Sequence, residues 1–393
     1  MGPSSFSGLD DVLSLVRRAV LARPQRRGSS KDKLKSGRSA MTQGSGLDQA
    51  KLEALLGKMV VELGAAANAS LVLVGEKLGL FRALGAHGPL TSASLAQQTG
   101  TNERYIREWL SAQAASGYVQ YDPGTAAFSL SPEQAAVFAD EDSPVNMAGG
   151  FYSLAAVFAG EPRLTEAFKT GTGIGWGEHC TCLFCGTERF FRPGYKAHLV
   201  AEWLPALDGV VARLSQGARV ADVGCGHGAS TTIMGQAFPS SKFTGYDFHA
   251  PSIETARGKL NAPANVDFKV ARAQDFGDGT YDLVTIFDAL HDMGDPAAAA
   301  AHIRSRLKDD GTFMIVEPLA GDRLEDNLHP VGRIYYAFST AICVPASLGQ
   351  ETGTALGAQA GEKRLRDILT GAGFSRVRRA TETPFNMVLE ARP

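Results

Sequence analysis

Hydrophobic positions follow two different patterns along the chain and predict two kinds of domain. Residues 44–145 carry apolar side chains mainly at helical spacing, as at Leu52 and Leu56. Residues 206–393 instead alternate short apolar runs with helical stretches, which predicts a parallel sheet with helices on both faces. The stretch between them, 146–205, is rich in aromatic residues. We therefore expect a helical domain, an aromatic helical connector or lid, and an α/β domain.

The helical domain contains the pattern of a winged helix. Thr91 is a good N-cap for a helix over 92–99, and Gly100 ends that helix. Asn102 then begins a second helix, and the run 118–130, which contains a Pro-Gly turn, predicts a β-hairpin wing. The second helix opens with as many acidic as basic residues, a poor footprint for phosphate. We expect this domain to serve dimerisation or substrate covering rather than DNA binding.

The α/β domain contains several short runs with strand character. The expected parallel strands are 220–223, 242–246, 266–270, 281–287 and 311–316. Two later runs, 373–380 and 386–391, flank a turn at Pro384 and can pair antiparallel.

Composition and charge narrow the class of protein. The formal net charge is −2, so nothing at the level of the whole chain favours a nucleic-acid partner. No apolar run reaches the roughly 18 residues that a membrane span needs. Five cysteines, few and odd in number, favour reduced thiols and a cytoplasmic location. The basic, acid-poor residues 1–43 predict a disordered extension rather than a transit peptide, with Met41 as a plausible natural start.

The segment around residues 222–228 carries the clearest chemistry. A short apolar strand ends at Asp222-Val-Gly224-Cys225-Gly226-His-Gly228, and a helix follows. Such a turn lets the backbone approach a nucleotide-like ligand closely. Its spacing is not that of a dinucleotide loop, and Asp222 would repel a pyrophosphate but suit a cationic ligand such as S-adenosylmethionine.

These residues resemble the first motif of the class I S-adenosylmethionine-dependent methyltransferases. The resemblance implies a Rossmann-like seven-stranded sheet and S-adenosylmethionine as the cofactor. It assigns Asp247 as the ribose-binding acid. The position of Asp247 at the end of the second strand is also where a ribose-binding carboxylate is expected. The full set of expected cofactor residues is Asp222, Gly224, Cys225, Gly226, Gly228, Asp247, Phe248, Ala273, Gln274 and Asp288.

With the winged helix in front, the domain order resembles small-molecule O-methyltransferases. The segment Leu290-His291-Asp292-Met293-Gly294-Asp295 is similar to their Leu-His-Asp-Trp-Ser-Asp segment, with Met293 in place of the tryptophan. The resemblance makes His291 the candidate general base, and Asp292 and Glu317 are candidates to orient its imidazole. A histidine suits proton removal from a hydroxyl because its pKa is near neutrality. Expected substrate contacts are Tyr152, Trp176, His179 and Tyr335.

Two local patterns in the connector leave alternatives open. His179, Cys180, Cys182 and Cys185 have donor types found in zinc sites, but no second pair of cysteines completes one. We expect ordinary packing there and no metal, with metal, metalloid or redox chemistry as alternatives. The glycine-dense run 171–177 predicts an irregular loop or a lid hinge.

The sequence therefore predicts an S-adenosylmethionine-dependent methyltransferase that modifies a small molecule, most readily at a hydroxyl. We expect a homodimer without nucleic-acid or membrane partners. The alternatives are a winged-helix DNA-binding regulator with a ligand-sensing domain and a nicotinamide oxidoreductase. The sequence does not identify the acceptor.

Overall fold

The computed structural model describes residues 47–259 and 262–393. The predictions for residues 1–43 and for Met41 lie outside this range. The chain divides into two units, residues 1–71 and 72–393.

The long first helix, α2 (Gln49–Lys77), corrects one expectation. It has 29 residues, and its most apolar 18-residue window has a mean hydropathy of 1.4, so it is long and apolar enough to cross a membrane. The sequence argument looked for an apolar run, and charged residues interrupt every such run in this helix. They are few enough that the mean hydropathy of the window stays high. Core helices of soluble proteins pass the same test, which makes it weak evidence for a membrane.

The winged-helix domain has the predicted caps and wing. Its helices are α3 (Leu80–His87), α4 (Ser92–Thr99), α5 (Glu103–Ala115) and α6 (Pro132–Phe138), and its antiparallel wing strands are β1 (Gln120–Asp122) and β2 (Ala127–Ser129). The Thr91 side chain accepts a hydrogen bond from Ser94 N, and Gly100 ends α4 with φ 62°. Asn102 caps α5 by accepting from Arg104 N. The order of helices, turn and hairpin confirms the winged-helix prediction.

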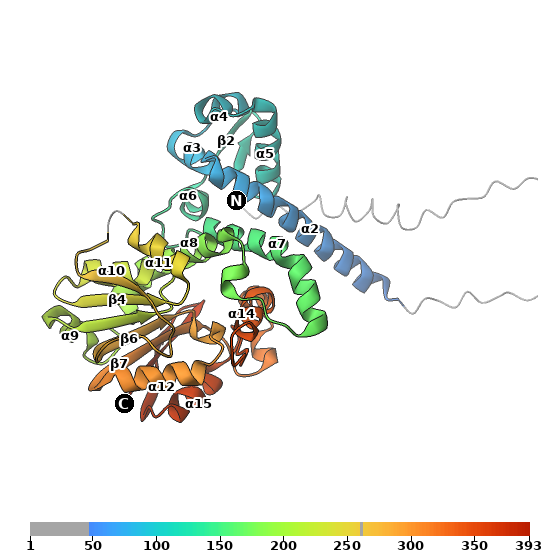
Figure 1. Ribbon diagram of the computed structural model, residues 1–393. Helices are drawn as coiled ribbons and strands as arrows, with labels where there is room; N and C mark the ends of the chain where they lie inside the picture. The colour runs from blue at the N-terminus through green and yellow to red at the C-terminus, as the bar shows by residue number, and fades with distance from the viewer. Residues whose placement is uncertain (1–46, 260–261) are drawn as a thin grey trace, which may run out of the picture. The chain divides into compact units, whose positions relative to one another are not determined.

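Two long helices and two short ones follow the winged-helix domain. They are α7 (Ala148–Thr170), η1 (Trp176–Glu178), α8 (Thr181–His198) and η2 (Leu199–Trp203), drawn in green in Figure 1. Between α7 and η1, residues 171–175 of the glycine-dense run form an irregular loop, while the rest of the run enters η1. The hinge role of this loop stays a prediction. A Cβ on Gly173 would lie 1.9 Å from Gly349 N, so this glycine permits close backbone packing.

The C-terminal domain is built on one seven-stranded sheet of order β5-β4-β3-β6-β7-β9-β8. The strands are β3 (Arg219–Val223), β4 (Lys242–Asp247), β5 (Val266–Val270), β6 (Tyr281–Phe287), β7 (Leu307–Pro318), β8 (Arg376–Glu382) and β9 (Asn386–Arg392). Strands β3 to β7 are parallel, and β9 is antiparallel to both β7 and β8. Strand β7 begins at Leu307, earlier than the predicted Gly311.

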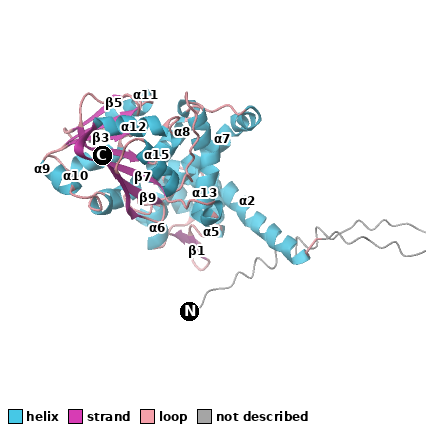
Figure 2. Ribbon diagram, turned by 90° about the horizontal axis from the view of Figure 1, so that it is seen from below, coloured by secondary structure: helices cyan, strands magenta, loops and turns pink. Residues whose placement is uncertain are grey.

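Helices cover both faces of this sheet, as expected. They are α9 (Val210–Gln216), α10 (Ala229–Ala237), α11 (Ala250–Arg257), α12 (Pro296–Arg306) and α15 (Glu362–Gly371). Met234 of α10 packs with Val220 on one face, whereas Ile303 of α12 packs with Ala221 on the other. Successive strand residues point to opposite faces, so both sides of β3 are buried. The strands are magenta in Figure 2, with cyan helices on either side.

The strand order reverses between β3 and its neighbour β6. The chain moves outward from β3 to β4 and β5, then returns to the other side of β3. In open α/β sheets, ligands bind at such a switch point beyond the carboxyl ends of the strands. The glycine turn after β3 and the segment holding His291 after β6 both lie at this edge. Sheet topology therefore brings the two predicted motifs together.

Candidate active site

One large cavity lies at the carboxyl ends of the parallel strands. Its volume is about 610 Å³, within the range typical of small-molecule sites. The predicted site residues among its lining are Gly224, Cys225, Gly226, Asp247, Phe248, Ala273, Gln274, Asp288, His291, Asp292, Trp176 and Tyr335. The cavity therefore joins the expected cofactor motif to the expected catalytic segment.

The glycine turn forms one wall of the cavity. Gly224 N donates to Tyr246 O over 2.7 Å, which holds the turn against β4. Gly224 and Gly226 have φ of 73° and 51°, values that a residue with a Cβ rarely adopts. A Cβ built on Gly226 meets no atom within 4 Å, so it would stand in open space. The backbone at Gly226 is thus open to a ligand.

Gly228, the third glycine of the turn, has a different structural role. Gly228 does not line the cavity, and a Cβ there would lie 2.4 Å from the ring of Phe268. Gly228 also has φ of 73°, immediately before α10 begins. It therefore lets the helix start close to β5, which supports the turn indirectly.

Asp247 stands at the end of β4 beside this turn. Its Oδ2 accepts from Gly226 N over 2.9 Å, and its Oδ1 accepts from His249 N over 2.8 Å. Burial raises the pKa of Asp247, although these two backbone donors oppose the rise. A carboxylate held this way presents its remaining lone pairs to the cavity and can accept hydrogen bonds from vicinal hydroxyls.

Asp222 is placed differently from the expectation. Its side chain does not line the cavity, and its oxygens accept hydrogen bonds from Ser230 Oγ at 2.7 Å, Thr231 Oγ1 at 2.6 Å and Thr285 Oγ1 at 3.0 Å. Burial raises its pKa to about 6 despite these donors. The carboxylate ties β3 to α10 and β6 behind the turn. A direct contact between Asp222 and a ligand is not supported by this placement.

Asp288 follows β6 and has an unusual backbone. Its φ is 49°, in the left-handed region, and its backbone N donates to Val316 O over 2.8 Å. The side chain accepts from Tyr195 Oη at 3.0 Å and from Asn386 Nδ2 at 2.7 Å. Burial and the neighbouring Glu317 raise the pKa of Asp288 to about 7. Two separate segments therefore fix this carboxyl at the cavity wall, and a third holds its backbone.

His291 lies in a short 3₁₀ turn, η3 (Leu290–Asp292), directly after β6. Its Nδ1 lies 2.5 Å from Oε2 of Glu317, and its Nε2 lies 3.3 Å from Oδ1 of Asp292. Glu317 does not line the cavity, whereas His291 and Asp292 do. The structure thus brings the three predicted catalytic residues together.

The two carboxylates determine the charge of this imidazole. Burial by itself lowers the pKa of His291, but Glu317 and Asp292 outweigh it and raise that pKa well above the usual value. Burial also raises the pKa of Asp292. The imidazolium is therefore favoured at neutral pH when both carboxyls are ionised.

Two of the four expected substrate contacts do not reach the cavity. Tyr152 lies against the Arg189 guanidinium, 5.1 Å from its ring centroid, and is not part of the lining. His179 is also outside the lining, with its Nε2 buried and without a hydrogen-bond partner among the described residues. On α7 it is Gly150 and Ser153 that reach the cavity. Each residue turns about 100° around a helix, so neighbouring positions face different ways.

Several lining residues had no signal of their own in the sequence. The cavity also contacts Leu183, Phe184, Phe190, Phe191, Tyr195, Phe338, Ile342 and Cys343. Four of them, Phe184, Phe190, Phe191 and Tyr195, were visible only as part of an aromatic-rich stretch. Their side chains make much of the cavity wall apolar, as a site that keeps water from a reacting group requires.

The cysteines near the start of α8 form a disulfide. Cys180 and Cys182 are bonded to each other, while Cys185 is an exposed free thiol. This corrects the expectation of reduced thiols. Two of the three sulfurs are taken, so the zinc alternative at this segment loses its ligands in the oxidised state.

The seven-stranded order and the glycine turn define a class I methyltransferase fold that follows a winged-helix domain. Residues 195–348 match the model of a methyltransferase domain, and residues 66–139 match that of an Rv2258c-like winged HTH domain. The resemblance stated from the sequence is thereby confirmed.

Curated relatives match only part of the chain. A ubiquinone biosynthesis O-methyltransferase of Xanthomonas campestris pv. campestris (strain B100) is 33% identical over 114 residues, covering 28% of this chain and 47% of that protein. The highly reducing polyketide synthase resH of Aspergillus sclerotiorum is 31% identical over 121 residues, which cover 28% of this chain and 5% of that protein. The matched region thus spans half or less of these relatives.

Solved structures match over nearly the whole chain at lower identity. A putative O-methyltransferase from Nostoc punctiforme PCC 73102 aligns with a TM-score of 0.63 and 20% identity, covering 86% of this chain and 98% of that one. Human N-acetylserotonin methyltransferase, crystallised with S-adenosylmethionine, aligns with a TM-score of 0.64 and 19% identity, covering 89% and 99%. These likenesses establish that the arrangement of both domains recurs in methyltransferases.

Proposed function

We propose that this protein transfers the methyl group of S-adenosylmethionine to a hydroxyl oxygen of a small molecule. The observation that carries the proposal is the single cavity that joins the glycine turn and Asp247 to His291. One end offers backbone and a carboxylate to a nucleoside. The other end offers a buried imidazole beneath an apolar roof.

The cofactor end fits this ligand chemically. Asp247 can accept from the ribose hydroxyls, and Gly226 leaves room for the ligand against the turn. Ala273 and Gln274 border the adenine side, and Asp288 offers a carboxyl to the cationic amino-acid part. When bound, the cofactor supplies an activated methyl group. The protein then mainly has to align and desolvate the acceptor.

At the acceptor end, His291 is the proposed general base. Its Nε2 would take the proton of the acceptor hydroxyl while Glu317 holds Nδ1. Because the pKa of His291 is raised, the neutral base form gains population only as pH rises. Trp176 and Tyr335 are the proposed contacts for the acceptor, with the aromatic residues of α8 excluding water.

We further propose a cytoplasmic homodimer without nucleic-acid partners. Exposed apolar side chains on α2 support a protein contact; they are Leu55, Met59, Val60, Val61 and Leu63. On α5, Arg104 is paired with Glu108 and Arg107 with Glu103, which leaves little positive charge for phosphate. Three of the five cysteines are free thiols, which supports the cytoplasmic location.

The first experiment measures cofactor binding by calorimetry with S-adenosylhomocysteine. We expect tight binding by the wild type and loss of it in Asp247→Ala, with the exposed Glu254→Ala as the matched control on α11. Binding of NADH instead would support an oxidoreductase and overturn the proposal. A DNA mobility shift at low salt that depends on Arg104 and Arg107 would support the regulator instead.

A second experiment identifies the acceptor. Labelled S-adenosylmethionine is incubated with a panel of phenols, carboxylic acids, thiols and amines, and label transfer is followed. We expect transfer to hydroxyl compounds that is lost in His291→Ala. Transfer only to nitrogen or sulfur would contradict the assigned acceptor atom.

A further inference from the structure

The first turn of α8 carries a disulfide where a helix usually has a capping side chain. Cys180 is the N-cap residue of α8, and its side chain makes no capping hydrogen bond to the residues that the structure describes. That side chain is instead bonded to Cys182, the second residue of the helix. Serine, threonine, aspartate and asparagine are the usual caps, because their oxygens accept hydrogen bonds from the free N–H groups. A covalent bond between side chains thus replaces the usual cap.

This turn forms part of the cavity wall. Leu183 and Phe184, the next two residues after the disulfide, line the cavity, and Trp176 lines it from the chain before the disulfide. The rings of Phe184 and Trp176 pack together with their centroids 5.5 Å apart. Cys182 packs against the same apolar cluster as Leu183. The disulfide therefore adjoins residues that bound the cavity.

The bond closes too short a loop to act mainly as a brace for the whole fold. Cys180 and Cys182 are two positions apart in the sequence. The stabilisation that a disulfide provides by restricting the unfolded chain grows with the length of the loop it closes. This bond therefore constrains little beyond the start of α8. In a reducing compartment such as the proposed cytoplasm, disulfides are mostly transient and take part in catalysis or redox sensing.

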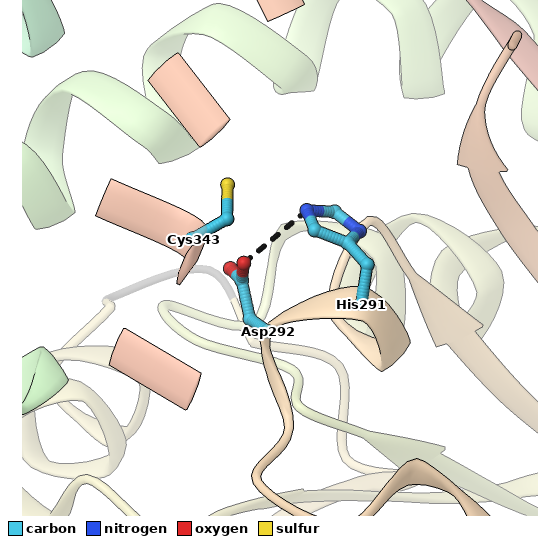
Figure 3. Close-up of side chains that lie close together, drawn as sticks. All are labelled: His291, Asp292 and Cys343. Atoms are coloured by element: carbon cyan, nitrogen blue, oxygen red, sulfur yellow. Dashed lines mark ion pairs between the residues drawn. The ribbon is translucent and has the colours of Figure 1, made fainter. Parts of the chain in front are cut away.

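The sulfur atoms of the chain differ in how easily a dissolved thiol can reach them. Cys180 is exposed, and so is the free thiol of Cys185. Cys225 and Cys343 are buried free thiols, and burial raises the pKa of both, for Cys343 to about 12. In Figure 3 the Cys343 side chain lies close to Asp292, in the wall of the active site. Thiol–disulfide chemistry with a dissolved partner is therefore directed to the start of α8.

We infer that Cys180 and Cys182 form a reversible site for exchange with small thiols, and that its reduction loosens the first turn of α8. The thiolate of one small thiol attacks the exposed Cys180 sulfur, and Cys182 leaves as a thiolate. A second small thiol then attacks the first in the mixed disulfide and releases Cys180. The protons of the two small thiols end on the two cysteines. The protein disulfide is reduced by two electrons, while the small thiols are oxidised to their own disulfide.

The place of Cys182 in the helix favours this reaction. Free N–H groups in the first turn of a helix stabilise negative charge, so a thiolate leaves more readily there than from a loop. After reduction, α8 has neither the covalent link nor an oxygen cap at Cys180, so its first turn opens more easily. This inference goes beyond the methyl-transfer proposal, because the reaction at the cysteines requires neither cofactor nor acceptor.

The first test titrates the full-length protein with mixtures of reduced and oxidised glutathione. Remaining thiols are alkylated at each ratio, and the peptides are analysed by mass spectrometry. We expect Cys180 and Cys182 to become alkylated together as reduced glutathione increases, and to form their disulfide again when oxidised glutathione is restored. A bond that persists in a large excess of reduced glutathione overturns the site. A bond from Cys182 to Cys185 in its place overturns the pairing.

The second test measures amide hydrogen exchange in the oxidised and the reduced protein. Leu183 N, which donates to Cys180 O over 2.9 Å, is among the amides that opening of the first turn would expose. We expect residues 183–187 to exchange about fivefold faster after reduction, the usual effect of losing an N-cap. The central strands β3 and β6 should keep their rates. Equal exchange of residues 183–187 in the two states overturns the link between the disulfide and the helix.

Matched variants separate these outcomes from misfolding. Cys180→Ala removes the bond without supplying a cap, so α8 should exchange as fast as in the reduced wild type, in either glutathione mixture. Cys180→Ser supplies a hydroxyl cap and should exchange more slowly than Cys180→Ala. Cys185→Ser removes the neighbouring free thiol and should keep the glutathione titration of the wild type. Slow exchange at the start of α8 in Cys180→Ala would contradict the inference.

Two further measurements keep this result apart from that of the functional proposal. Thermal melting shows that each variant is folded before its exchange is compared. Binding of S-adenosylhomocysteine by the wild type tests the cofactor site separately. Failure to bind it would count against methyl transfer alone, whereas failure of the glutathione titration would count against the thiol–disulfide site alone.

Discussion

The Nδ1 atom of His291 lies 2.5 Å from Oε2 of Glu317, and both side chains are almost completely buried. The other oxygen of the same carboxylate, Oε1, accepts from Leu290 N over 2.9 Å. Glu317 belongs to β7, which is paired with β6 just before the histidine. One carboxylate thus fixes both the backbone of η3 and the orientation of the imidazole.

Replacement of the imidazole should affect turnover more than cofactor binding. In His291→Ala we expect kcat to fall by about 10²- to 10⁴-fold, the usual contribution of a general base. The affinity for S-adenosylhomocysteine should change little, because Asp247 and the glycine turn hold the ligand. Steady-state kinetics and calorimetry on the same preparations check this. Turnover at the wild-type rate would rule out the base assignment.

Glu317→Gln tests the orienting carboxylate through the pH profile. Glu317 raises the pKa of His291, so its neutralisation should lower that pKa. A general base works in its deprotonated form, so the rise of kcat with pH should move to lower pH in this variant. A profile that keeps its midpoint would show that Glu317 does not control the imidazole charge. Glu382→Gln, at an exposed position on β8, is the control.

Much of the fold was predictable because local signals agreed with tertiary packing. Thr91 and Asn102 are side-chain caps whose hydrogen bonds lie within their own helices. The central strands β3 and β6 are largely buried, and their apolar residues form short runs that can be seen in the sequence, whereas the edge strand β5 is mostly exposed. The cofactor motif is a single continuous segment, and its glycines lie at the turn where their backbone freedom is needed.

The parts of the site that were missed depend on contacts between distant segments. In the sequence Asp222 looks like a ligand-binding residue. In the structure the direction of its side chain is set by hydrogen bonds from Thr231 and Thr285, which lie on two neighbouring elements. Cys343 carries no local motif, and only the fold brings it to His291. Tyr152 was predicted from residue type alone, without the phase of its helix.

Asp222 should make stability depend on pH. Its pKa rises from 3.8 to about 6 on folding, so folding favours the protonated form. The stabilisation of the folded state by protonated Asp222 is complete below about pH 4 and is lost as pH rises through about 6. A shift of about two units corresponds to about 3 kcal/mol at most.

The comparison of wild type with Asp222→Asn isolates this effect from the other titrating groups. Asparagine stays neutral, so the melting temperature of the wild type should fall relative to that of Asp222→Asn between pH 4 and 7. Thermal melts in a series of buffers measure the difference. Parallel curves across this range would mean that Asp222 does not ionise with the shifted pKa.

Substitution by alanine should affect two glycines of the same turn differently, lowering mainly stability at Gly228 and mainly ligand binding at Gly226. In Gly228→Ala the new methyl group would lie 2.4 Å from the Phe268 ring, so we expect a clear loss of thermal stability. In Gly226→Ala the methyl group meets no protein atom, and only the cost of a left-handed backbone, about 1–2 kcal/mol, applies. That methyl group would occupy space at the cavity wall, so Gly226→Ala should fold but bind S-adenosylhomocysteine far more weakly. Calorimetry and thermal melts on both variants decide the matter: full binding by Gly226→Ala would show that the ligand does not approach the turn.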